Sequence, residues 1–176
     1  MLRKLTALKS EGINFRRDFN DLKTKLMDES KRIKDTLLTP AVSFNARQLN
    51  DLSLETGQTV VFSKTMANHG DAYDNVTGIF TAPVGGTYVF TIHLCVNGGY
   101  TFYYDIIRDS EIQAYGRFYE DGSTACHSAN AIMVLEARQK VWLKCLMGST
   151  SSDILSEYDS TSYNYWNTFS GVLIHK

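Results

Sequence analysis

The side chains best suited to bind a ligand lie in a polar, ring-rich segment near the C-terminus. The segment combines aromatic rings with hydrogen-bonding groups: Tyr158, Asp159, Tyr163, Asn164, Tyr165 and Trp166. Sugars present apolar C–H faces that stack on rings and hydroxyl groups that bond to Asp and Asn. The same rings suit a subunit interface, where Tyr and Trp are enriched. The segment therefore predicts either a carbohydrate site or a subunit contact, and both interpretations also apply to Tyr115 and Tyr119.

Cysteine and histidine side chains offer a second kind of chemistry. His93 and Cys95 lie on the same face of an expected strand, and Cys126 and His127 are adjacent elsewhere. Nitrogen and sulfur ligands suit a transition metal if all four converge, but half-buried strand side chains are the ordinary interpretation. With Cys145 the chain has 3 cysteines. One disulfide with one free thiol and three buried thiols are both compatible with this number.

The sequence lacks the compact motifs of catalysis. It has no Gly-x-Ser-x-Gly turn, no His-Glu-x-x-His motif and no glycine-rich phosphate loop ending in Gly-Lys-Ser/Thr. Serine, histidine and aspartate occur without a spacing that brings a base next to a nucleophile. We therefore expect a non-enzymatic protein with no catalytic residues.

Composition limits the class of protein that these side chains serve. With 176 residues, one globular domain and an appendage are expected, and 12% aromatic residues argue against disorder. A net charge of −1 gives no reason to expect nucleic acid as a partner. No apolar run is long enough for a membrane span.

Charge and rings divide the chain at residues 39–40. Residues 1–38 hold 10 of the 18 Lys and Arg but 6 of the 19 Asp and Glu, a net charge of +4. Residues 39–176 have a net charge of −5 and hold 19 of the 21 aromatic residues. We therefore expect two units, an oligomerisation helix over 1–39 and a globular domain over 40–176.

The first unit is predicted to be one amphipathic helix. Apolar side chains occupy eight of its eleven heptad a and d positions: Met1, Leu5, Leu8, Phe15, Phe19, Leu22, Leu26 and Ile33. A stripe this narrow is typical of a coiled coil. A single helix that packs on its own domain is the alternative. Gly12 weakens the first turns, and Pro40 ends the pattern.

The second unit is predicted to be antiparallel β structure. Residues 88–96 alternate between apolar and other side chains, which is the period of a strand with one buried face. An Asn-Gly-Gly run at 97–99 predicts a hairpin turn, with 102–107 as the returning strand. Asp-Gly at 121–122 marks a second turn. The other expected strands are 129–135, 141–146 and 169–174. Glycine-rich turns at short intervals favour an all-β sandwich or jelly roll.

One set of rings and small residues has a more specific spacing. Its members are Phe62, Asn68, Tyr73, Phe80, Gly86, Tyr88 and Phe90. This spacing resembles the signature of the C1q domain, the globular head of complement component C1q and its relatives. Residues 78–83, 141–143 and 168–173 are also similar to that family, so the resemblance covers about residues 41–175. Two positions depart from the family pattern. Ile92 stands where the signature has an aromatic residue, and Arg-Gln at 138–139 stands where Gly-Asp is usual.

The resemblance implies a ten-stranded jelly roll that assembles as a homotrimer, as in the tumour-necrosis-factor-like superfamily. The Gly-X-Y repeat of a collagen stalk is absent, and the heptad helix stands in its place. Relatives often bind Ca²⁺ near the top of the trimer, through the loop before the strand at 129–135. Glu120 and Asp121 occupy that loop, and their oxygens suit Ca²⁺. A hydrated Asp-Gly turn is the alternative.

The functional expectation is a C1q-like lectin, similar to the pattern-recognition lectins of invertebrate innate immunity. Such a protein binds carbohydrate or other microbial surface molecules, and three weak sites on one stalk gain avidity. The alternative is a trimeric ligand or scaffold that recognises a protein receptor. Secretion is expected for such a protein, although no apolar signal segment follows the basic start at residues 1–5. Two alternatives stay open: a cytosolic chain, or a mature secreted form that begins with an added Met1.

Overall fold

The computed structural model describes residues 2–37, 40–155 and 166–176, with side chains described for 13–34 in the helical range. The chain divides into two compact units, Met1–Thr39 and Pro40–Lys176. The first is helical, and the second, called the head below, is built from two β-sheets. No helix in the described ranges is long and apolar enough to cross a membrane.

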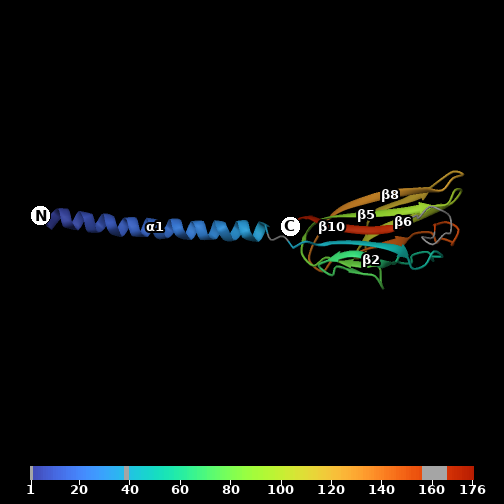
Figure 1. The fold of residues 1–176 in the computed structure, drawn as a ribbon, viewed down its shortest axis with the longest axis horizontal. Coiled ribbons are helices and arrows are strands. Elements are labelled where there is room, and N and C mark those ends of the chain that lie inside the picture. The colour runs from blue at the N-terminus through green and yellow to red at the C-terminus, as the bar shows by residue number, and fades with distance from the viewer. Residues whose placement is uncertain (1, 38–39, 156–165) are drawn as a thin grey trace. The chain divides into compact units, whose positions relative to one another are not determined.

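Helix α1, Leu2–Leu37, is one continuous element and confirms the predicted helix (Figure 1). Its described heptad side chains are each more than half exposed: Phe15, Phe19, Leu22, Leu26 and Ile33. Ile13 and Met27 are exposed as well, but they occupy heptad b positions and lie outside the apolar stripe. Such a stripe is the surface that a coiled coil buries. Association through it stays a prediction.

Ten strands form the head within the described residues, all in antiparallel pairs (Figure 1). The first sheet has the order β2-β1-β10-β5-β8 and the second β3-β4-β9-β6-β7. The strands of the first sheet are β1 Ser43–Leu49, β2 Phe62–His69, β5 Gly86–Val96, β8 Ala125–Leu135 and β10 Thr168–His175. Those of the second are β3 Tyr73–Asp74, β4 Ile79–Thr81, β6 Thr101–Arg108, β7 Glu111–Tyr119 and β9 Lys140–Cys145. The predicted all-β jelly-roll sandwich is confirmed.

The core lies between the sheets and is rich in the rings of the sequence signature. The inward side chains of β5 are fully buried: Tyr88, Phe90, Ile92 and Leu94. Ile92 therefore fills an inward position although it replaces an aromatic residue. The Tyr73 hydroxyl donates to the Phe62 carbonyl at 3.3 Å and accepts from the Phe62 amide at 3.1 Å. Burial raises the pKa of Tyr73 to about 12.

The hairpin predicted around residues 97–99 is wrong. The turn itself is present, because the Tyr100 amide donates to the Asn97 carbonyl at 3.2 Å. However, β5 already pairs with β10 on one edge and with β8 on the other, so neither edge is open to β6. The chain instead crosses to the second sheet, where β6 lies between β9 and β7. A turn signal specifies a local reversal but not the sheet that the next strand joins.

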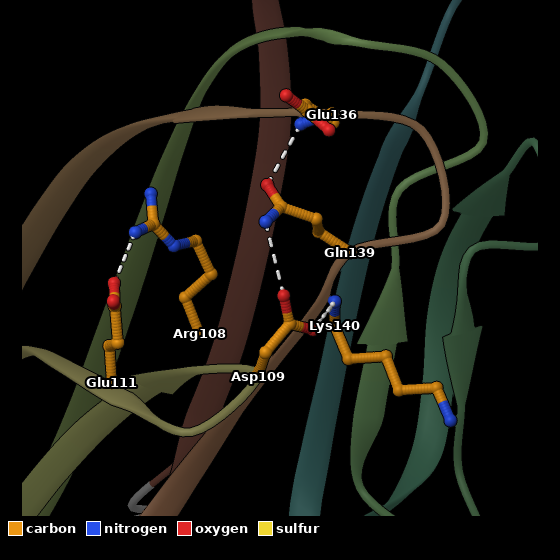
Figure 2. Close-up of polar contacts among 6 residues, drawn as sticks. All are labelled: Arg108, Asp109, Glu111, Glu136, Gln139 and Lys140. Atoms are coloured by element: carbon orange, nitrogen blue, oxygen red, sulfur yellow. Dashed lines mark hydrogen bonds and ion pairs between the residues drawn. The ribbon is translucent and has the colours of Figure 1, made fainter.

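At the other end of β6, side-chain hydrogen bonds link two neighbouring turns (Figure 2). Asp109, between β6 and β7, accepts from the Lys140 amide at 2.9 Å and from Gln139 Nε2 at 3.1 Å. Gln139 Oε1 accepts from the Glu136 amide at 2.9 Å, within the turn between β8 and β9. These bonds fix the end of the head at which β6 leads into β7 and β8 leads into β9.

Candidate ligand-binding site at the apex of the head

Three connections meet where β5 ends and β6 begins, and this end of the head is called the apex below. Asn97 holds them together: its Nδ2 donates to the Ser152 carbonyl at 2.7 Å, and its Oδ1 accepts from Thr124 Oγ1 at 3.3 Å. The Gly99 amide donates to the Glu120 carbonyl at 2.8 Å. The apex is therefore one hydrogen-bonded arrangement of segments that are far apart in the sequence.

The residues on both sides of the ring-rich segment, Leu155 and Asn167, form hydrogen bonds with the backbone of Cys95 on β5. Asn167 is 1% exposed; its Oδ1 accepts from the Cys95 amide at 2.8 Å, and its Nδ2 donates to the Leu155 carbonyl at 2.7 Å. The Leu155 amide donates in turn to the Cys95 carbonyl at 2.9 Å. The chain on either side of 156–165 is thus fixed at the end of β5.

Of the six residues predicted to bind carbohydrate, only Trp166 lies within the described ranges. Five others lie outside the described residues: Tyr158, Asp159, Tyr163, Asn164 and Tyr165. The Trp166 side chain is 47% exposed, and the Arg47 guanidinium carbon lies 4.2 Å from the centroid of its ring. This is a cation–π contact. The apex thus exposes an indole beside a permanent positive charge.

The two residues predicted to bind calcium lie in the connection between β7 and β8. Asp121 is exposed, whereas Glu120 is half-buried and its Oε1 lies 3.2 Å from Nε2 of His127. The His127 ring stacks on the buried ring of Phe118, with centroids 5.5 Å apart. Glu120 thus faces a histidine, and calcium coordination by Glu120 and Asp121 stays a prediction.

The structure brings three of the four predicted nitrogen and sulfur ligands together and leaves His127 outside the group. His93, Cys95 and Cys126 come together, with one ligand atom of each within 4.8 Å of the others, and the two cysteines form a disulfide. His127 contacts Phe118 instead, so convergence of all four ligands is wrong. Cys145 is a buried free thiol whose pKa is raised by burial. Of the alternatives for the cysteines, one disulfide with one free thiol is therefore the one observed.

The two tyrosines on β7 lie on the outer face of the second sheet. Tyr115 is 77% exposed and Tyr119 is 46% exposed. The Arg117 guanidinium lies over the Tyr119 ring at 5.8 Å from its centroid. These rings form a separate accessible surface on the flank of the head, because strand β7 is the free edge of its sheet.

Sequence reasoning did not single out Arg47 or Asn167. Arg47 carries no local signal, because its contact with Trp166 depends on the pairing of β1 with β10. Asn167 stands directly before β10, where a single amide side chain is too common to mark a buried anchor. Both residues are recognisable only after the strands have been placed.

A family model described as the C1q domain matches residues 43–174, most of the chain. The chain belongs to the C1q domain family. Among curated relatives of this family, human complement C1q tumor necrosis factor-related protein 5 is 30% identical over 116 residues, 65% of this chain and 45% of that protein. Zebrafish (Danio rerio) Caprin-2 is 30% identical over 139 residues, 77% of this chain and 14% of that protein. This C1q chain therefore matches less than half the length of either relative.

Solved structures with the same fold extend beyond the C1q family. The globular domain of zebrafish complement 1qA matches with a TM-score of 0.59 and 20% identity, over 77% of this chain and 98% of that one. Murine APRIL matches with a TM-score of 0.55 and 7% identity, over 76% and 99%. The Eiger TNF of S. frugiperda matches with a TM-score of 0.55 and 10% identity, over 77% and 93%. At these identities the likeness shows a shared fold.

Proposed function

We propose that this protein is a C1q-like lectin, a non-enzymatic pattern-recognition protein that binds carbohydrate or other microbial surface molecules at the apex. Domains of the C1q family are ligand-binding modules. The observation that carries the proposal is the half-exposed Trp166 beside Arg47, on a base anchored by Asn167. An indole offers a flat face to the C–H side of a sugar, and a guanidinium donates hydrogen bonds to hydroxyl groups.

Assembly of three heads is part of this proposal, since domains of this family typically trimerise. The outer face of the first sheet supports it with a row of apolar side chains on neighbouring strands. Val172 of β10 lies opposite Val89 of β5, which lies opposite Ile132 of β8. Ile132 is 71% exposed and Val134, further along β8, is 68% exposed. Exposed apolar surface of this kind is typical of a contact with another protein surface.

The stripe on α1 would join the same three chains into one stalk. Three weak sites held together bind a glycan-coated surface more tightly than one, because binding of the second and third heads becomes intramolecular. Secretion fits this role and is supported by the Cys95–Cys126 disulfide, since disulfides persist in oxidising compartments. Innate immune recognition of microbes is the setting that the lectin proposal implies.

Calcium binding by Glu120 and Asp121 is the accessory part of the proposal. The two residues are adjacent in a connection that reaches the apex through the bond between Gly99 and Glu120. Carboxylate and carbonyl oxygens are the ligands that Ca²⁺ takes. A bound ion would compete with His127 for Glu120. Calcium would then order the loop beside the ligand site.

A glycan array with the full chain, read with and without EDTA, tests the lectin proposal. We expect binding to specific glycans and a weaker signal in EDTA if Glu120 and Asp121 hold calcium. Trp166→Ala should abolish the signal, whereas Tyr115→Ala, which removes an exposed ring from the flank, should preserve it. Absence of binding to every glycan would contradict the proposal. A signal unchanged by EDTA would contradict its calcium part.

The stalk can be tested separately with two substitutions on α1. Leu22→Asp places a charge in the apolar stripe, whereas Thr24→Asp places the same charge two residues away, outside the heptad a and d positions. We expect Leu22→Asp to weaken binding to a glycan-coated surface by about 100-fold or more and to leave binding of a free sugar unchanged. Thr24→Asp should affect neither. Equal losses for the surface and the free sugar would contradict multivalent binding.

A trimeric ligand for a protein receptor is the second candidate, and the exposed flank of the head favours it. Tyr115 and Ile112 on β7 are 77% and 55% exposed. Tyrosine is enriched in the hot spots of protein interfaces. Under this alternative the array stays silent, and Tyr115→Ala rather than Trp166→Ala removes binding to cells that carry the receptor.

A further inference from the structure

Three metal-ligating side chains converge on the outer face of the first sheet, below the apex. Strand β5 places His93 and Cys95 on this face, and β8 places Cys126 directly opposite Cys95. One ligand atom of each residue lies within 4.8 Å of the other two. Ligand atoms of a tetrahedral zinc site are about 3.5–3.8 Å apart, given zinc bonds of about 2.0–2.3 Å. Once the sulfurs are separate, small side-chain rotations suffice to reach that geometry.

His93 is oriented by a neighbour in the way that metal-ligating histidines are. Its Nδ1 lies 2.8 Å from the hydroxyl oxygen of Ser128, the residue opposite it on β8. Such outer hydrogen bonds fix the ring of a ligand histidine and raise metal affinity. In the single head, strand β8 is the free edge of the sheet, Cys126 is exposed and His93 is partly exposed, so an ion reaches these residues from solvent. Cys95 and Cys126 lie six residues along β5 and β8 from Val89 and Ile132, at the apex end of the face proposed to contact other heads.

We propose that reduction of the Cys95–Cys126 disulfide opens a zinc site formed by both cysteine sulfurs and the His93 imidazole. A dithiol supplies two electrons and two protons: the sulfur–sulfur bond breaks, each cysteine becomes a thiol, and the dithiol becomes a disulfide. Zn²⁺ then binds the two thiolates and the imidazole and displaces both thiol protons to solvent. Water completes the tetrahedron. In the oxidised state the two thiolate ligands are absent, so the site is closed.

The experiment measures zinc bound by the full chain before and after reduction. A phosphine serves as the reductant; it takes oxygen from water to become the phosphine oxide and leaves both sulfurs as thiols. A chromogenic chelator competes for Zn²⁺ and reports affinity. We expect the reduced protein to bind one zinc ion per chain and the oxidised protein to bind none. Equal binding in the two states, or one ion for every three chains, would overturn the proposal.

Matched variants identify the ligands. His93→Gln should weaken zinc binding more than Ser128→Ala, which removes an outer hydrogen bond and should cost about 10-fold. His127→Gln and Cys145→Ala are the controls, because His127 contacts Phe118 and Cys145 lies buried on β9. Circular dichroism checks that each variant is folded. Full affinity in His93→Gln, or loss in either folded control, would contradict the assignment.

Cobalt provides a readout that does not depend on the chelator. Co²⁺ in place of zinc gives a thiolate-to-metal charge-transfer absorption when sulfur is a ligand. We expect this band in the reduced protein and in reduced Cys145→Ala, and its absence in the oxidised protein. Reduced Cys126→Ser should lose about half of the band, because one of two sulfur ligands remains. An undiminished band in reduced Cys126→Ser would overturn the proposal.

Discussion

The helix and the head expose their large apolar side chains to opposite extents. On α1 the rings of Phe15 and Phe19 are 73% and 58% exposed, whereas in the head those of Phe90 and Phe169 are fully buried. The phenylalanine rings of the head core are therefore buried within one chain, whereas the phenylalanine rings of α1 are exposed on the helix. Burial of a ring of this size contributes about 1.5–3 kcal/mol. Burial of rings therefore stabilises the folded head. The apolar stripe of α1 would contribute in the same way once another surface covers it.

The sharpest test of this difference removes one ring from the head. Phe90 contacts the rings of Phe44, Phe80, Tyr88 and Phe169 across the core. Phe90→Ala removes these contacts and leaves a cavity, so we expect the free energy of unfolding to fall by about 3–5 kcal/mol. Urea denaturation followed by tryptophan fluorescence measures it. A loss below about 1 kcal/mol would mean that the head is not held by this core.

The next largest effect is a loss of head stability in alkali. Burial raises the pKa of Tyr73 to about 12, above the value of 10.0 for a free tyrosine. The folded state therefore favours the neutral phenol. This contribution is complete below pH 10 and disappears as the pH rises through 12. A shift of this size corresponds to about 2–3 kcal/mol.

Comparison of the wild type with Tyr73→Phe isolates this contribution from other groups that titrate in alkali. The variant lacks both hydrogen bonds to Phe62, so it starts less stable at neutral pH. Between pH 10 and 12 the wild type should lose more stability than the variant, and the two unfolding curves should converge. Parallel curves throughout this range would contradict a buried neutral Tyr73.

Local sequence patterns predict the individual strands of this fold, whereas pairings between residues far apart in the sequence are not predicted. Alternation along residues 88–96 identifies β5, and the spacing of the signature rings identifies the jelly roll. The predicted hairpin between β5 and β6 is wrong because strands that are distant in sequence, β10 and β8, pair with both edges of β5. The pairing of Cys95 with Cys126 depends on the same long-range register, which is why the cysteine count alone left two alternatives open.

The candidate site follows from the sequence only in part. Composition alone marks the ring-rich segment, and Trp166 is exposed as a ligand-binding ring requires. Its neighbour Arg47 was not recognised, because β1 and β10 bring the two together across most of the chain. His127 is next to Cys126 in the sequence, yet adjacent residues of a strand point to opposite faces. Strand parity therefore separates the two.

A smaller effect is expected from the turn network at the end of the head away from the apex (Figure 2). Asp109→Ala removes two hydrogen bonds, to the Lys140 amide and to Gln139. It also leaves alanine at a positive φ of 53°. We expect a loss of about 1–2 kcal/mol, because the site is solvent-exposed. Asp109→Gly, which tolerates the φ angle, should recover part of that loss. Equal stability of the two variants would contradict the backbone contribution.

The smallest effect on head stability is expected when a phenylalanine of α1, rather than Phe90 of the head, is replaced by alanine. Phe19→Ala removes a ring of the same size as Phe90, but one that is 58% exposed in the single chain. The free energy of unfolding of the head should change by no more than about 0.5 kcal/mol. Association of the chain, measured by sedimentation at several concentrations, should weaken. If Phe19→Ala destabilised the head as Phe90→Ala does, the stripe would be packed on its own head, and the stalk would have no free surface with which to join other chains.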